Sequence, residues 1–365
     1  MRAAWCLPLL ALTALAAGDV AARSPAAAPA DLAATGLYSD AATKTVDPRH
    51  MAYAPQYPLW SDGAAKRRWI SLPPGKPIDA ADPDVWTFPV GAKLWKEFSF
   101  HGRPVETRYM EALGRGRWRF ATYVWNAEGT AATRAPDNGL KGVVEIAPGI
   151  RHDIPSVIDC RACHEGRQAE ALGFSALQLS PDRDSLAPHA EPVPPGGVDL
   201  TTLLQRRLLK HAPRAWAERP PRIDAPSPAA RAALGYLHAN CGNCHSPAGP
   251  LDSRGLLLRH SVAPGAKGEP AIDTTKDRPG RYRIPGLPPE RTRLLSPGDP
   301  AGSSVAHRMA ARDAITQMPP LGTKIADAEA VDLVRRWIRE MAVRPHIEAG
   351  ETEDRKPNTQ KEEKQ

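Results

Sequence analysis

Four of the chain's five cysteines lie in two copies of one pattern, in which two cysteines are separated by two residues and followed by histidine. The copies are CRACH at 160–164 and CGNCH at 241–245. This spacing places both thiols on one helical turn, where they can form thioethers with the two vinyl groups of a haem while the adjacent imidazole binds the iron. The pattern predicts two covalent c-type haems. The residues predicted to hold them are Cys160, Cys163 and His164 for the first, and Cys241, Cys244 and His245 for the second.

Other uses of paired cysteines fit less well. A zinc ribbon places its two pairs roughly 15–20 residues apart, whereas Cys160 and Cys241 are 81 residues apart. A thioredoxin-like redox pair needs a βαβ context, and the sequence has none. Two disulfides would suit an exported chain but leave the histidine after each pair unexplained.

The sixth ligand of the second haem is predicted to be Met318, which lies in the sequence QMPPLGT at 317–323. Two prolines stiffen this loop, and a thioether facing the proximal histidine gives a His/Met haem of raised potential. The other candidates downstream of the second motif are His260, His307, Met309 and Met341. Met309 and Met341 fit the apolar stripes of helices and are expected in the core.

The distal ligand of the first haem stays open. No methionine lies between His164 and Met309. The upstream candidates are Met110 and His152, and His189 and His211 follow downstream. An iron without a sixth protein ligand is the remaining alternative, and it could bind small molecules.

The N-terminus has the pattern of a cleavable signal peptide over residues 1–22. Arg2 precedes an apolar run, and small residues follow it. Cys6 lies inside that run and would leave with it. Residues 23–36 are expected to form a flexible leader, and 346–365 a disordered charged tail. The protein is therefore expected in the periplasm.

The net charge is +7, and the basic residues are spread along the chain. Such a charge favours solubility and could steer an acidic redox partner protein. Without a basic block, nucleic-acid binding is not expected. No apolar run beyond the N-terminus is long enough to span a bilayer, which excludes a multi-pass membrane protein.

The expected fold class is α+β with several domains. Short segments rich in aromatic and β-branched residues at 66–72, 93–100, 105–113 and 117–125 predict a β-rich domain over 37–150, with a tight hairpin at Gly114–Gly116. A first haem module at 151–215, a Pro-rich linker at 216–226 and an all-α haem domain at 227–345 would follow.

Helices are expected at three places. The segment 199–211 has an apolar stripe of leucines. Ser227 is a helix N-cap followed by Pro228, and this helix leads into Cys241. Asp327 caps a last helix whose stripe includes Val331, Val334 and Ile338.

The C-terminal segments LGYLHANCGNCH, SPGDPAGSSVAHRM and MPPLGT resemble a class I cytochrome c domain over 228–342. The stretches YPLWSDGAAKRRWI, FPVGAKLWKEF, VETRYM, ATYVWN, IPSVIDCRACH and LGFSALQLS resemble a family of exported bacterial dihaem c-type cytochromes without a settled physiological role. The resemblance implies two covalent haems and supports Met318 as an axial ligand.

Three functions are compatible with these observations. Two six-coordinate haems would make an electron-transfer protein, and this is the main expectation rather than a self-standing enzyme. An open first haem would make a peroxidase-like dihaem oxidoreductase. A binding module with structural haems is the third alternative.

Overall fold

The structure is a computed structural model that describes residues 27–165, 171–247 and 249–342. The expected signal peptide at 1–22, with Cys6, and the expected tail at 346–365 lie outside the described residues.

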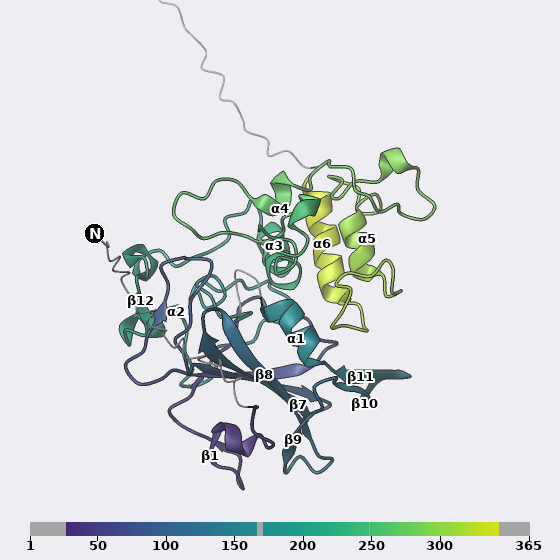
Figure 1. The fold of residues 1–365 in the computed structure, drawn as a ribbon. Helices are drawn as coiled ribbons and strands as arrows, with labels where there is room; N and C mark the ends of the chain where they lie inside the picture. Colours follow the sequence, from purple (N-terminus) through teal and green to yellow (C-terminus); the bar gives the residue numbers. More distant parts are fainter. Residues whose placement is uncertain (1–26, 166–170, 248, 343–365) are drawn as a thin grey trace, which may run out of the picture.

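A six-stranded antiparallel sheet in the order β3-β4-β6-β7-β8-β9 is the largest element of the fold (Figure 1). Three small two-stranded sheets accompany it: β1-β2, β10-β11 and the parallel pair β5-β12. The strands are β1 (Tyr38–Asp40), β2 (Thr45–Val46), β3 (Met51–Ala52), β4 (Ala65–Ser71), β5 (Ile78–Asp79), β6 (Lys93–Phe100), β7 (Arg103–Gly114), β8 (Arg117–Trp125), β9 (Ala132–Arg134), β10 (Leu140–Ala147), β11 (Ile150–Ile154) and β12 (Leu209–Lys210). The four predicted strands correspond to β4, β6, β7 and β8.

Side-chain alternation along these strands gives the sheet two buried faces. One face carries Trp95, Tyr109 and Tyr123, which pack against residues 28–37. The other carries Leu94 and Met110, which pack against the chain between Ala171 and Trp216. The predicted hairpin is confirmed, since Gly114, Arg115 and Gly116 join β7 to β8 with positive φ.

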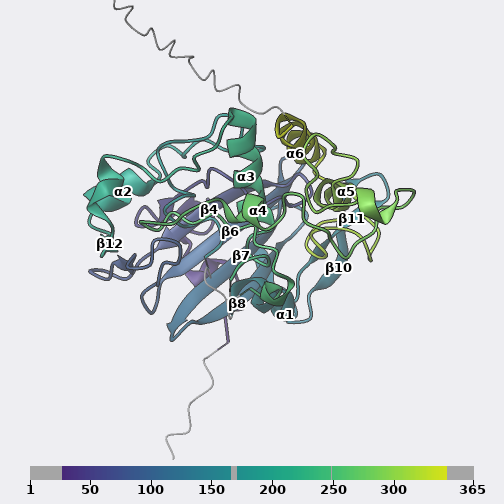
Figure 2. The same ribbon diagram turned by 90° about the horizontal axis from the view of Figure 1, so that it is seen from above.

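Six helices are described: α1 (Val157–His164), α2 (Leu200–Gln205), α3 (Pro228–Asn240), α4 (Pro270–Asp273), α5 (Ser304–Ala310) and α6 (Ala328–Glu340). Helices α3, α5 and α6 pack together beside the sheet, and α1 lies between them and β8 (Figures 1 and 2). Ser227 and Asp327 cap α3 and α6 as predicted. None of the described helices is long and apolar enough to cross a bilayer.

The predicted fold class is wrong, because the C-terminal part is not an all-α domain. Most of the described chain between α3 and α6 is irregular, and its described residues form only α4, α5 and short 3₁₀ turns. The segment 246–303 is rich in proline and glycine, which interrupt helices. The described fold is mostly β, with short helices attached.

The helix predicted at 199–211 is present only as α2, and the prediction is wrong for the second half. Arg207 adopts positive φ, and Leu209 and Lys210 then pair in parallel with Ile78 and Asp79. Leucines that share a helical stripe in the sequence are thus divided between a helix and a strand.

The flexible leader predicted at 23–36 is also wrong in its described part. Leu32 is buried, and its N–H donates to the carbonyl of Ala132 at 3.0 Å. Tyr123 donates its hydroxyl to the carbonyl of Pro29 at 2.9 Å. Within the predicted linker at 216–226, Trp216 and Ile223 are buried in the two cores that flank it.

The segment around Tyr57 joins the N-terminal part of the chain to the C-terminal helices. Tyr57 is buried in the same core as α3 and α6, and its ring packs directly against Gly235 of α3. The N–H of Trp60 donates to Asn240 Oδ1 at 2.7 Å, and its indole donates to the carbonyl of Ile325 at 2.9 Å. The Tyr57 segment and the C-terminal helices therefore share one core.

A partly buried pair of His189 and Asp327 near this junction should make stability depend on pH. His189 Nε2 lies 2.9 Å from Asp327 Oδ1, and this hydrogen bond raises the pKa of His189 above 6.5. Because the pKa of His189 is higher in the folded than in the unfolded state, the interaction stabilises the fold fully at pH values below the unfolded-state pKa. That contribution is lost as the pH rises through the folded-state pKa. We expect His189→Gln to lose about 1 kcal/mol or less at about pH 6, and less at about pH 9.

The measurement is urea unfolding of both proteins across that pH range. His101→Gln, which changes an exposed turn histidine, is the control and should follow the wild type. Equal losses at both pH values would contradict the assignment.

Candidate functional site

The first CxxCH motif occupies the last turns of α1. Ser156 caps this helix through a reciprocal pair of hydrogen bonds with Asp159. Cys160, Cys163 and His164 stand at positions i, i+3 and i+4 of the helix and so share one face. Both thiols and the imidazole can therefore act on one ligand.

Helix α1 has no buried residue, and Ile158 is 76% exposed. An eight-residue helix usually requires an apolar contact to be stable. The ring of His164 lies 5.7 Å from that of Phe120 on β8, which is one of its contacts with the sheet. A flat apolar group attached to both cysteines would add apolar contact on the helix face that carries Cys160, Cys163 and His164.

The second motif begins where α3 ends. Cys241 is the C-cap residue, and its carbonyl accepts from the N–H of Cys244 at 3.0 Å and of His245 at 2.9 Å. These bonds close one helical turn that carries the two thiols and the imidazole together. The carbonyl of His245 accepts from Leu258, which fixes the following loop.

His245 is suited to bind a metal. Its side chain is 9% exposed, and its Nδ1 is buried without a hydrogen-bond partner in the described chain. Burial lowers the pKa of His245. The backbone of Leu256 raises this pKa in part, and the positive charge of Arg308 lowers it again. A neutral imidazole is the form that coordinates iron.

One hydrogen bond joins the two motifs directly. Asn243, which lies between Cys241 and Cys244, donates its Nδ2 to the backbone carbonyl of Cys163 at 3.0 Å. Two groups attached to these motifs would therefore lie next to each other. The sequence separation of 80 residues gives no indication of this contact.

The cysteines do not fit the alternative chemistries as well. Both Cys160 and Cys241 are half-buried, and this partial burial raises the pKa of Cys160 to about 11 and that of Cys241 to about 12, so these two thiols are protonated at neutral pH. Zinc binding and thiol redox catalysis use the thiolate. Within the described ranges the four cysteines form no disulfide. No group of three side chains among His, Cys, Asp and Glu lies close enough together there to hold a metal ion. The raised pKa values of these two thiols disfavour chemistry that needs the thiolate at neutral pH.

Met318 is half-buried in the loop between α5 and α6. Its N–H donates to the carbonyl of Arg308 at 2.9 Å, and Arg308 is the residue whose charge acts on His245. The fold thus connects the Met318 loop to the second motif.

The other candidate ligands of the second haem are engaged elsewhere. Met309 is buried in the core, and Met341 packs against it, as expected. His260 Nδ1 lies 2.6 Å from Glu269, and His307 Nδ1 lies 3.1 Å from the hydroxyl of Tyr282.

Of the candidates for the first haem, Met110 is best placed. It pairs across strands with Phe120, so both side chains lie on the sheet face that His164 contacts. We call this side, which carries Met110 and Phe120, the α1 face. His152 is a buried residue of β11, and its Nε2 lies 3.1 Å from Glu106.

The two downstream histidines are less suitable. His189 has Asp327 at one ring nitrogen and Glu329 at the other. His211 is largely exposed, and its Nδ1 bonds Asp79 at 2.9 Å.

The sequence analysis missed a row of basic residues on the α1 face. Lys66, Arg68, Lys96 and Arg108 lie on β4, β6 and β7 with their side chains on this face. Their spacing of two from the apolar residues Ile70, Leu94 and Met110 was the available signal.

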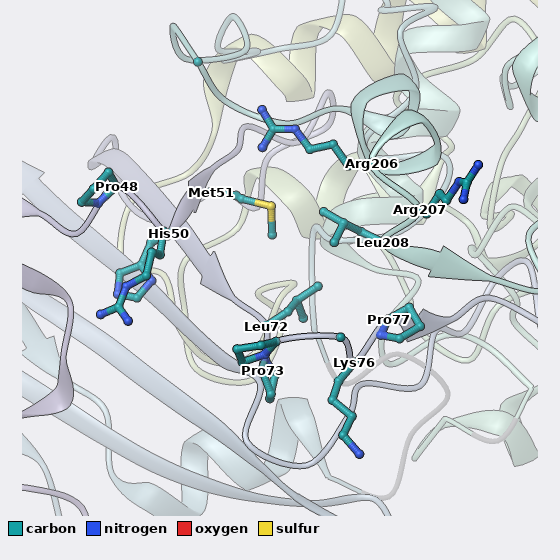
Figure 3. Close-up of a pocket in the computed structure, with 14 residues that line it drawn as sticks. Pro48, His50, Met51, Leu72, Pro73, Lys76, Pro77, Arg206, Arg207 and Leu208 are labelled. Atoms are coloured by element: carbon teal, nitrogen blue, oxygen red, sulfur yellow. The ribbon is translucent and has the colours of Figure 1, made fainter.

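A cavity of about 660 Å³ lies away from the motifs (Figure 3). Met51, Leu72 and Leu208 surround it, with Arg206 and Lys76 at its margin. Its lining includes no residue of either CxxCH motif. It carries prolines and basic side chains but no carboxylate.

The geometry is therefore that of two adjacent, helix-borne Cys-x-x-Cys-His sites of which the second has a buried imidazole. Compared with protein families, curated proteins and solved structures, the chain has no match.

Proposed function

We propose that the protein is an exported c-type cytochrome that carries electrons through two covalently bound haems, one on each CxxCH motif. We further propose that it belongs to the exported bacterial dihaem c-type cytochromes that its sequence resembles. The observation that carries the proposal is the hydrogen bond from Asn243 to the carbonyl of Cys163, which holds the two motifs in contact.

Each bound haem would supply a one-electron couple. The chain's own residues then have distinct tasks. His164 and His245 would hold the two irons, and Met318 would supply a thioether ligand to the second. Met110, which neighbours Phe120 on the α1 face, is the favoured distal ligand of the first.

The surroundings of the second site favour a stable low-spin centre. Its imidazole is buried and kept neutral, and the loop that carries Met318 is tied to α5 through Arg308. A His/Met ligand pair raises the reduction potential. The second haem would then be the terminal electron acceptor within the chain.

The partner would be a redox protein, and the net charge of +7 favours an acidic one. The signal-like N-terminus makes the periplasm the proposed location.

The test is the haem content with the visible and low-temperature spin-resonance spectra of the purified protein, oxidised and half-reduced. Two haems per chain, both low-spin, are the expected result. No covalent haem would overturn the proposal, and zinc or disulfide chemistry would return.

A peroxidase-like oxidoreductase is the second candidate. The observation that favours it is the bond between His152 and Glu106, which occupies Nε2 of one of the two upstream ligand candidates. One high-spin haem, with hydrogen peroxide turned over by the half-reduced protein, would support it. Two low-spin haems without turnover would exclude it.

A further inference from the structure

The α1 face holds more positive charge than the described chain balances. Arg68, Lys96 and Arg108 are directly opposite one another across β4, β6 and β7, and Lys66 lies two residues from Arg68 on the same side. Adjacent strands are about 4.8 Å apart, and like charges placed opposite one another destabilise a sheet. We call these four residues the basic row.

Three carboxylates act on the basic row, and the third, Asp327, attracts Lys66 but also bonds His189. Glu106 lies 2.6 Å from Arg108, and Glu191 lies 2.7 Å from Arg68. Glu106 also bonds His152. Lys66 and Lys96 form no hydrogen bond or ion pair with another described residue. The ammonium of Lys96 lies 4.9 Å from the centre of the Phe98 ring, which Arg108 also contacts.

The row also leaves buried polar atoms without partners in the described ranges. They are Nη2 of Arg68, Nε of Arg108 and one oxygen of Glu106. The side chain of Arg68 is 3% exposed, so water does not readily replace the missing partner. A buried N–H without an acceptor carries a free-energy cost, and a bound anion would remove that cost at Arg68 and Arg108.

The basic row lies beside the first CxxCH motif. Arg108 is two residues from Met110 on β7, and Phe120, the cross-strand partner of Met110, has its ring 5.7 Å from that of His164. Burial and the neighbouring Arg68 and Lys66 lower the pKa of Lys96 well below its usual value. A bound anion would reverse that shift.

We infer that the basic row is a binding site for carboxylate or small oxyanion groups next to the first motif. Two sources have this chemistry: the propionates of a haem on Cys160 and Cys163, or a free anion that reaches that haem. The first source depends on the function proposed above, and the row itself does not.

The experiment titrates acetate and sulfate into the full-length protein at constant ionic strength and follows the unfolding temperature. It uses the protein with both haems and a Cys160→Ala/Cys163→Ala variant. Lys96→Met tests the row because it breaks no ion pair. Lys93→Met is the matched control, since that ammonium is on the same strand and donates to the carbonyl of Thr35.

If acetate or sulfate binds saturably only in the variant without the first haem, and Lys96→Met weakens that binding about tenfold, the propionates are the groups that occupy the basic row. Saturable binding in the protein with both haems would identify a free anion. Lys93→Met should leave both affinities unchanged. No saturable response in either form, or equal effects of the two lysine variants, would overturn the inference.

A second measurement covers the case in which the double-alanine variant does not fold. In the protein with both haems, Lys96→Met should shift the reduction potential of the first haem, and Lys93→Met should not. Equal potentials in all three proteins would contradict the inference even though the haem count supports the proposed function. A wild type without haem would contradict only the proposed function, because the same titration then tests the row alone.

Discussion

Replacement of Cys160 and Cys163 by alanine is expected to reduce the covalent haem content from two per chain to one. The thioethers need both thiols, and the fold places each pair on a single helical turn. Haem per chain, measured by absorbance and by the mass of the intact protein, gives the result directly.

The reciprocal variant, Cys241→Ala/Cys244→Ala, should also retain one haem, with the spectrum of the other site. The contact between the motifs is retained in both variants, because Asn243 bonds to the backbone of Cys163. Loss of both haems from either double variant would show that the sites do not load separately. Unchanged haem content in either would refute the assignment of that motif.

Gly235→Val is expected to lower the free energy of unfolding by about 3 kcal/mol or more. A Cβ atom at Gly235 would overlap the ring of Tyr57, which is fully buried and hydrogen-bonds Asp184 at 3.1 Å. Replacement of a helix-interior glycine by alanine otherwise stabilises a helix by about 0.5–1 kcal/mol. Gly235→Ala should therefore lower the free energy of unfolding, although helix propensity alone would raise it.

Urea unfolding of Gly235→Ala, Tyr57→Leu and the double variant is the measurement. The alanine should cost much less in the Tyr57→Leu background, because the overlapping ring is gone. Equal costs in both backgrounds would mean that Tyr57 does not restrict the size of residue 235.

The local motifs could be predicted because short-range geometry determines them. Two residues between cysteines place both thiols on one turn, and Gly114 and Gly116 accept the positive φ of a tight hairpin. Ser227 and Asp327 cap their helices through hydrogen bonds within three residues. Tertiary contacts do not change these relations.

Other elements could not be predicted because distant pairing competes with local propensity. The stripe of leucines in 199–211 is divided because Leu209 and Lys210 pair with β5, more than a hundred residues earlier. The prediction of an all-α domain is wrong because the long segment between α3 and α5 contains too many prolines and glycines to form a helix longer than the four-residue α4.

The candidate site likewise combines features that could be predicted from the sequence with features that could not. The ligand-bearing residues of each motif follow from the sequence, but the Asn243 contact between the motifs is long-range. The basic row escaped prediction because charged residues in a strand are ordinarily expected on its solvent face. Here Arg68 is buried, and Lys96 points to the α1 face.

The junction between the Tyr57 segment and α3 has a consequence for the order in which the protein is made. Trp60 binds Asn240, a residue synthesised 180 positions later. At 5–20 residues per second the segment waits roughly 10–40 seconds for its partner helix. During that interval Tyr57 and Trp60 are without their native cover. A chain that ends before α3 would lack the contacts of Tyr57 with Gly235 and of Trp60 with Asn240, so we expect the N-terminal part alone to be less stable than the same part in the full chain.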